Sequence, residues 1–138
     1  TTTDLDLAAT REVVTRLAPL ANVRVGVVGQ LLAALEAGGR GALCFEANVA
    51  PRLCASVPAH FARGERAAAE AAFATLMELN AVLSRYQNPR SVKAAMDALG
   101  LAGGPPRRPY LPLPADEARD VARVLSELDI ARREGLVS

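Results

Sequence analysis

The sequence is poor in aromatic residues: it has no tryptophan, and phenylalanine and tyrosine make up only 4% of its 138 residues. Its hydrophobic fraction of 51% comes mainly from alanine, leucine and valine. Small aliphatic side chains of this kind favour closely packed helices over β-sandwiches or aromatic binding platforms. By length, the chain can bury roughly 68% of its unfolded surface within one domain.

The sequence also lacks a cluster of charge of one sign. Its 16 basic and 15 acidic residues are interspersed, and the net charge is +1. Nucleic-acid surfaces need a concentrated basic stripe, so this class of function is disfavoured. No apolar run approaches the ~18 residues of a membrane span, and no signal peptide opens the sequence. We therefore expect a cytoplasmic location.

Residues that bind metals are scarce. The two cysteines, Cys44 and Cys54, are expected to be buried thiols in a reducing compartment rather than a disulfide or a metal site. The single histidine, His60, has no cysteine or carboxylate at metal-ligand spacing, so we expect a surface or packing role. The sequence thus predicts neither a metal site nor a cofactor.

The stretch at 42–46 divides the chain into two kinds of pattern. Before it, a β-branched run at 23–28 predicts a buried strand, and 31–36 predicts a short helix. The strand expected at 42–46 would complete a βαβ unit, with glycines 38–41 forming a turn rather than a phosphate loop. After it, every pattern is helical, which is typical of a βα domain followed by a helical appendage.

The expected helices follow from apolar spacing and from breaker residues. Thr3 is a candidate N-cap for the first helix, whose apolar stripe is Ala9, Val13 and Leu17. Pro58 should kink or shorten a helix at 51–62. Further helices are expected at 65–86, at 88–99 with Asn88 as cap, and at 115–128. The proline-rich stretch 103–114 predicts an extended loop, and the tail after Asp129 is expected to fray.

Four blocks of sequence carry a family resemblance. They occur in one order across nearly the whole chain: GGRGALCFEANVAP at 38–51, Asn88-Pro89 followed by Val92-Lys93-Ala94-Ala95, Leu99-Gly100-Leu101, and Arg107-x-Pro109-x-x-Pro112-Leu113. Together they resemble the dihydrodipicolinate synthase and N-acetylneuraminate lyase family. The chain looks like the C-terminal half of such a protein. Residues 1–62 would be the last two βα units of a (β/α)₈ TIM barrel, and 63–138 a C-terminal helical domain.

The resemblance implies a Schiff-base lyase or aldolase that acts on pyruvate or a related 2-oxo acid. In the family a lysine forms the imine, and the match to Thr2-Thr3-Asp4-Leu5 puts that lysine before Thr1, so no catalytic residue is expected here. Gly29, Leu43, Phe45 and Glu46 would lie on the substrate side, with Leu43 and Phe45 on one face of the strand. The implied partners are the N-terminal barrel half and further copies of the protein, as dimer or tetramer.

Several alternatives remain open. A 2-keto-3-deoxy sugar acid aldolase or dehydratase would carry the same blocks, and a non-catalytic helical interaction or regulatory module would have kept the packing without the chemistry. Glu46 is either a substrate ligand or a paired structural carboxylate. Lys93, the single lysine, is expected to be structural and not the imine lysine. Arg107 is expected to hold the extended loop through hydrogen bonds.

Overall fold

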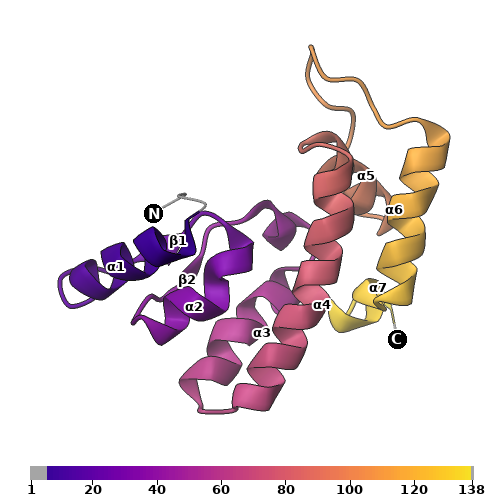
Figure 1. Ribbon diagram of the computed structural model, residues 1–138. Coiled ribbons are helices and arrows are strands. Elements are labelled where there is room, and N and C mark those ends of the chain that lie inside the picture. The colour runs from indigo at the N-terminus through magenta and orange to yellow at the C-terminus, as the bar shows by residue number, and fades with distance from the viewer. Residues whose placement is uncertain (1–5, 138) are drawn as a thin grey trace. The chain divides into compact units, whose positions relative to one another are not determined.

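The computed structural model describes residues 6–137, and Figure 1 shows the arrangement of its helices. The chain divides into two compact units. The first unit takes the described residues up to Cys44 together with Ala55–Ala74, and the second takes Phe45–Cys54 with the described residues from Thr75 onward. The domain boundary expected between 62 and 63 stays a prediction.

Helix α1 (Leu7–Leu17) opens the first unit. The Asp6 carboxylate accepts a hydrogen bond of 2.8 Å from the Ala8 N–H, so Asp6 is the N-cap. The cap predicted at Thr3 lies outside the described residues. The predicted inner stripe was wrong: Val13 and Leu17 are exposed, and it is Val14 that packs into the core of this unit.

The two strands are parallel but short. β1 (Arg24–Val25) pairs with β2 (Gly41–Ala42), and α2 (Leu31–Glu36) connects them, as the predicted βαβ unit requires. Further backbone bonds of 2.8 Å, from Arg40 N–H to the Val23 carbonyl and from Leu43 N–H to the Val25 carbonyl, flank the ladder. The strands predicted at 23–28 and 42–46 were too long. Soon after each strand the backbone forms a 3₁₀ segment, at Val28–Gln30 after β1 and at Phe45–Asn48 after β2, and the pairing between the strands ends.

The glycines at 38–41 serve the backbone of the turn into β2. Gly38 has a φ of +95°, which side chains with a Cβ rarely adopt. A Cβ on Gly39 would lie 2.8 Å from the carbonyl oxygen of Ala34. Close approach and positive φ therefore explain this cluster, and the predicted turn is confirmed.

Two helices connect the units in sequence. Helix α3 (Pro51–Ala62) has the predicted bounds, but Pro58 lies inside it and does not end it early. A proline removes one helical hydrogen bond, and the remaining bonds carry the helix for one more turn. Helix α4 (Arg66–Arg85) is the longest described helix, and in the second unit its Leu76, Leu79 and Leu83 are fully buried. No helix within 6–137 is both long and apolar enough to cross a membrane.

The second unit adds three helices. Helices α5 (Arg90–Ala98) and α6 (Ala115–Glu127) pack against each other and are joined by the predicted extended loop. Asn88 is not the cap of α5, because Pro89 occupies the N-cap position and makes no side-chain bond there. The Ser91 hydroxyl instead donates to the Leu83 carbonyl at 2.6 Å, which ties α5 to α4.

The prediction of a frayed C-terminal tail was wrong. A short helix α7 (Ile130–Arg133) follows α6, and Ile130 is fully buried. The Glu134 carboxylate accepts the backbone N–H groups of Arg52 at 2.8 Å and Leu53 at 2.9 Å. These donors belong to the first turn of α3, whose N–H groups have no partner within the helix and favour a negative charge. The tail is therefore held by a carboxylate that caps a helix 81 residues away.

Candidate functional site

The carboxyl ends of the two parallel strands form the candidate site in the first unit. Gly29 lies in the 3₁₀ turn that follows β1, and Leu43 comes directly after β2. Both residues are exposed, and the Leu43 side chain keeps 68% of its accessible surface. Because β1 and β2 run in the same direction, these residues follow the same edge of the sheet. This edge is where parallel α/β proteins place their ligands.

Phe45 begins the 3₁₀ segment in the second unit and is half-buried. Its carbonyl accepts a hydrogen bond of 2.9 Å from the Asn48 side chain, which stabilises the turn. The expectation that Leu43 and Phe45 share one strand face was therefore wrong, because strand alternation ends at Ala42. Cys44 likewise lies outside the strand, and both Cys44 and Cys54 are half-buried rather than buried.

Glu46 is the fully buried acidic residue of the same segment. The Asn80 side-chain amide of α4 donates to its Oε1, while Oε2 is buried and accepts no hydrogen bond from the described residues. Burying a carboxylate is costly unless it is hydrogen-bonded. This pairing corresponds to the structural alternative for Glu46. The sequence pattern does not single out Asn80 as the partner, although a polar residue directly after buried Leu79 is a usable signal.

His60 belongs to a polar cluster at the surface of the first unit. Its Nδ1 lies 2.5 Å from Glu65 Oε2, and Arg63 donates to both oxygens of Glu65 at 2.8 Å. Hydrogen bonds from Arg63 first, and then from His60, lower the pKa of Glu65 to about 2. Within the described part of the chain, no three histidine, cysteine or carboxylate side chains gather in a way that could hold a metal ion.

Side chains of α5 hold the extended loop of the second unit. Lys93 Nζ donates to the Gly103 carbonyl at 2.7 Å, which is a structural role as expected. Arg90 Nε donates to the Leu111 carbonyl at 2.7 Å, and its Nη2 donates to the Pro112 carbonyl at 3.2 Å. The role predicted for Arg107 is thus filled by Arg90, while the Arg107 side chain is exposed. The prediction failed because chain proximity within the loop does not reveal which helix lies beneath it.

The comparison with family models decides the ancestry of the chain. Residues 2–128 match the model of the dihydrodipicolinate synthetase family. The chain belongs to this family. The resemblance drawn from the four sequence blocks is therefore confirmed.

Relatives and solved structures agree with this membership. The chain is 33% identical over 124 residues to the 4-hydroxy-tetrahydrodipicolinate synthase of Sorangium cellulosum, covering 90% of this chain and 41% of the relative. It is 36% identical over 93 residues to that of Archaeoglobus fulgidus, covering 67% and 32%. The dihydrodipicolinate synthase structure from Aquifex aeolicus has a TM-score of 0.84 at 23% identity, covering 95% of this chain and 45% of that one. The Proteus mirabilis N-acetylneuraminate lyase has a TM-score of 0.77 at 22% identity, covering 92% and 43%.

The coverage limits what the membership implies for this chain. It spans less than half the length of the relatives it matches. The solved structures are barrel proteins of the family, so the chain has the fold of part of such a protein, with many helices and short strands. The activity of a whole family member does not transfer with the fold.

Proposed function

We propose that this chain is the C-terminal part of a Schiff-base lyase or aldolase acting on pyruvate or a related 2-oxo acid, similar to dihydrodipicolinate synthase. Residues 1–62 contribute the last two βα units of a (β/α)₈ barrel, and 63–138 form a helical domain. The observation that carries the proposal is the parallel β1–α2–β2 unit with Gly29 and Leu43 exposed after its strand ends. Barrel enzymes place their chemistry at this end of the strands.

In this proposal the chain supplies one wall of the pocket. Gly29 and Leu43 contact the 2-oxo acid, and Phe45 adjoins the variable part of the substrate. Glu46 acts indirectly, because its buried hydrogen bond with Asn80 holds the segment that follows β2 in place. Among the four substrate-side residues, Glu46 is therefore a positioning residue.

The imine-forming lysine comes from polypeptide outside this chain. A desolvated lysine amine with a lowered pKa is the nucleophile such chemistry needs. Lys93 does not suit that role, since its amine is held by the Gly103 carbonyl. The partners are the N-terminal barrel half, whose strands pair with β1 and β2, and further copies in a homo-oligomer. The chemistry needs no metal or cofactor, and the protein works in the cytoplasm.

Two alternatives have different consequences. A 2-keto-3-deoxy sugar acid aldolase or dehydratase would use the same 2-oxo acid end and differ at Phe45. A non-catalytic interaction or regulatory module would form no imine at all. The strand ends favour the enzyme, because Gly29 and Leu43 follow the same edge of a parallel sheet, which is where barrel enzymes place their chemistry.

Imine trapping tests the proposal. The native protein, with every polypeptide that co-purifies, is treated with pyruvate and borohydride and then mapped by mass spectrometry. We expect one reduced imine on a lysine outside this sequence, and Lys93→Ala should leave trapping intact. Trapping on Lys93 would contradict the assignment of the nucleophile. Absence of trapping in folded protein would favour the non-catalytic module.

Substitution after the strand end tests the pocket wall. Leu43→Asp should abolish trapping, because it sets a carboxylate close to that of the substrate in a partly dry pocket, where like charges repel by several kcal/mol. Phe45→Ala should change substrate preference more than imine formation. Leu111→Asp is the matched control, since Leu111 is equally exposed at 69% but lies in the extended loop. Unchanged pyruvate affinity in Leu43→Asp would remove this strand from the site.

A further inference from the structure

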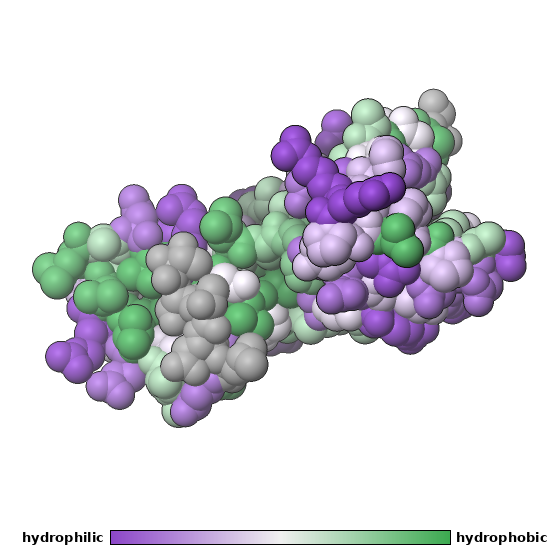
Figure 2. Space-filling view, turned by 90° about the horizontal axis from the view of Figure 1, so that it is seen from above, coloured by the Kyte–Doolittle hydropathy of each residue, from purple (hydrophilic) through white to green (hydrophobic). Residues whose placement is uncertain are grey.

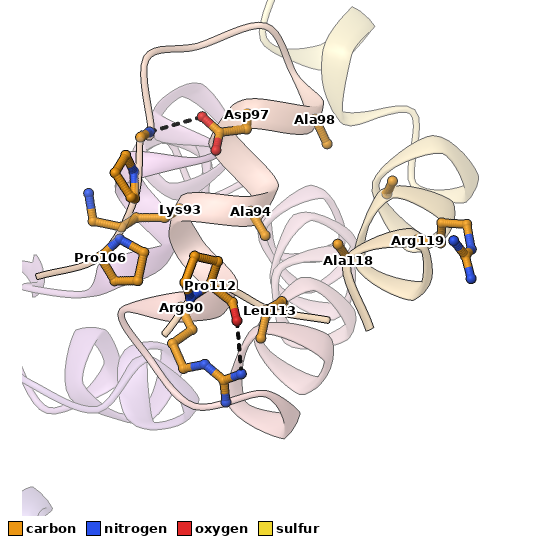
Figure 3. A pocket seen from close by; sticks show the side chains of 13 residues that line it. Arg90, Lys93, Ala94, Asp97, Ala98, Pro106, Pro112, Leu113, Ala118 and Arg119 are labelled. Carbon is orange, nitrogen blue, oxygen red and sulfur yellow. Dashed lines mark hydrogen bonds between the residues drawn. The ribbon is translucent and has the colours of Figure 1, made fainter. Parts of the chain in front are cut away.

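A groove of about 540 Å³ lies in the second unit between α5, the extended loop and α6 (Figure 3). This volume falls within the range of about 300–1,000 Å³ that is usual for small-molecule sites. The apolar side chains of its helical walls are short, and the loop contributes proline rings and Leu113. The alanines of the two helices are Ala94, Ala98, Ala118 and Ala122.

The groove stays open because the loop is held at its ends. At the start of the loop, Lys93 donates to the Gly103 carbonyl and the Asp97 carboxylate accepts the Gly104 N–H at 3.0 Å. Near the end of the loop, Arg90 donates to the carbonyls of Leu111 and Pro112. Between these attachments the loop spans α5 and α6, and methyl groups are too short to fill the space beneath it.

The charges along the groove are not balanced. Arg90 faces a carboxylate, since its Nη2 lies 3.9 Å from Glu117 Oε2. Lys93 is half-buried, yet within residues 6–137 no carboxylate oxygen comes within 4.0 Å of its amine. Asp97, four residues later, does not pair with it and binds the loop backbone instead. A half-buried ammonium beside an apolar wall is stabilised by an anion, because partial burial weakens its hydration.

We propose that this groove binds a small amphipathic carboxylate. The apolar part lies over the alanines and against the proline rings, and the carboxylate accepts hydrogen bonds from Lys93. An ammonium has three donors, and the Gly103 carbonyl uses one. The proposal is independent of the barrel chemistry, and none of its residues is among the four assigned to the 2-oxo acid pocket.

Three probes of equal chain length test the charge requirement. Octanoate, octanol and octylammonium are titrated into the full chain, well below their critical micelle concentrations, and binding is followed by calorimetry and amide chemical shifts. We expect octanoate to bind with shifts centred on α5 and α6, octanol to bind about 10-fold more weakly, and octylammonium not to bind. Equal affinity for octanoate and octanol, or no octanoate binding, would overturn the proposal.

Variants test the location. Ala94→Leu fills the groove with a strong helix former and should abolish octanoate binding while helicity by circular dichroism is kept. Lys93→Met should reduce the preference for octanoate over octanol to about 2-fold or less, and Lys93→Arg should retain it. Arg108→Met removes an exposed cation of the same loop that does not line the groove, and should bind octanoate like the parent. An equal loss in Arg108→Met, or unchanged binding in Ala94→Leu, would show diffuse surface adsorption and reject the site.

Discussion

The two units differ in where they leave their apolar side chains. The first unit exposes a stripe on α1 and the residue after β2, and Figure 2 shows hydrophobic side chains gathered over α1, at the left of the view. These residues are Leu7, Val13 and Leu17 on α1, Leu20 in the turn after it, and Leu43. The second unit buries the apolar faces of its helices. Its large exposed apolar residues lie in the extended loop, at Tyr110 and Leu111, and in the C-terminal segment, at Leu136 and Val137.

This contrast indicates two kinds of packing. The second unit contains the partners that its helices need, including a cap for α3 supplied by Glu134. Among its described residues the first unit pairs two strands, and a helix face with exposed leucines usually marks a surface that another segment covers. The helical part of the chain should therefore be more independent than the part with strands.

The largest effect is expected in the core of the second unit. Leu79 is fully buried, so Leu79→Ala should lower the free energy of unfolding by about 2–5 kcal/mol through lost contacts and a residual cavity. Leu17→Ala, on the exposed stripe of α1, should change it by less than about 0.5 kcal/mol. Urea unfolding followed by circular dichroism measures both. Similar losses in the two variants would mean that the units do not differ in this way.

A smaller effect is expected from the cap of α3. Glu134→Ala leaves two backbone N–H groups without their acceptor and should cost about 1.5–3 kcal/mol. The amide protons of Arg52 and Leu53 should then exchange faster with solvent. Glu127→Ala is the matched control, because Glu127 pairs with Arg123 at the surface and should contribute no more than about 1 kcal/mol. Unchanged exchange in Glu134→Ala would restore the picture of a frayed tail.

The smallest effect is expected on the stability of the protein at acidic pH. The pKa of Glu65 falls from 4.5 to about 2 on folding, so its contribution to stability is present above pH 4.5 and is lost as the pH falls toward 2. Glu65→Gln should flatten this part of the stability profile, measured as the thermal midpoint from neutral pH down to about 2. Glu65 and its partner Arg63 are both surface residues, so the change in the thermal midpoint should be slight.

Asp120 offers the corresponding test in the second unit. Hydrogen bonds from Arg123 first, and from Tyr86, lower the pKa of its carboxyl group. Its contribution is therefore also lost in acid, and Asp120→Asn should flatten the profile in the same direction. An unaltered acid profile in both variants would show that neither surface cluster couples folding to pH.

Local patterns in the sequence predicted most of the helices. The bounds of α2 and α3 agree with their expected ranges, and α4 and α6 do so within one residue at each end. Apolar spacing, prolines and glycines act within a few residues of one another, so a linear reading captures them. The strands were predicted in order and direction but not in length, because a strand ends where its neighbour stops pairing.

By itself the sequence determined the family, the βαβ unit and the largely helical second half. Only the tertiary structure decided which polar groups meet: Asn80 with Glu46, Arg90 with the loop carbonyls, and Glu134 with the start of α3. These partners are 34, 21 and 82 residues apart. Folding selects such contacts because a buried or terminal polar group must find some partner, and the local pattern around each one carries no information about which distant residue that will be.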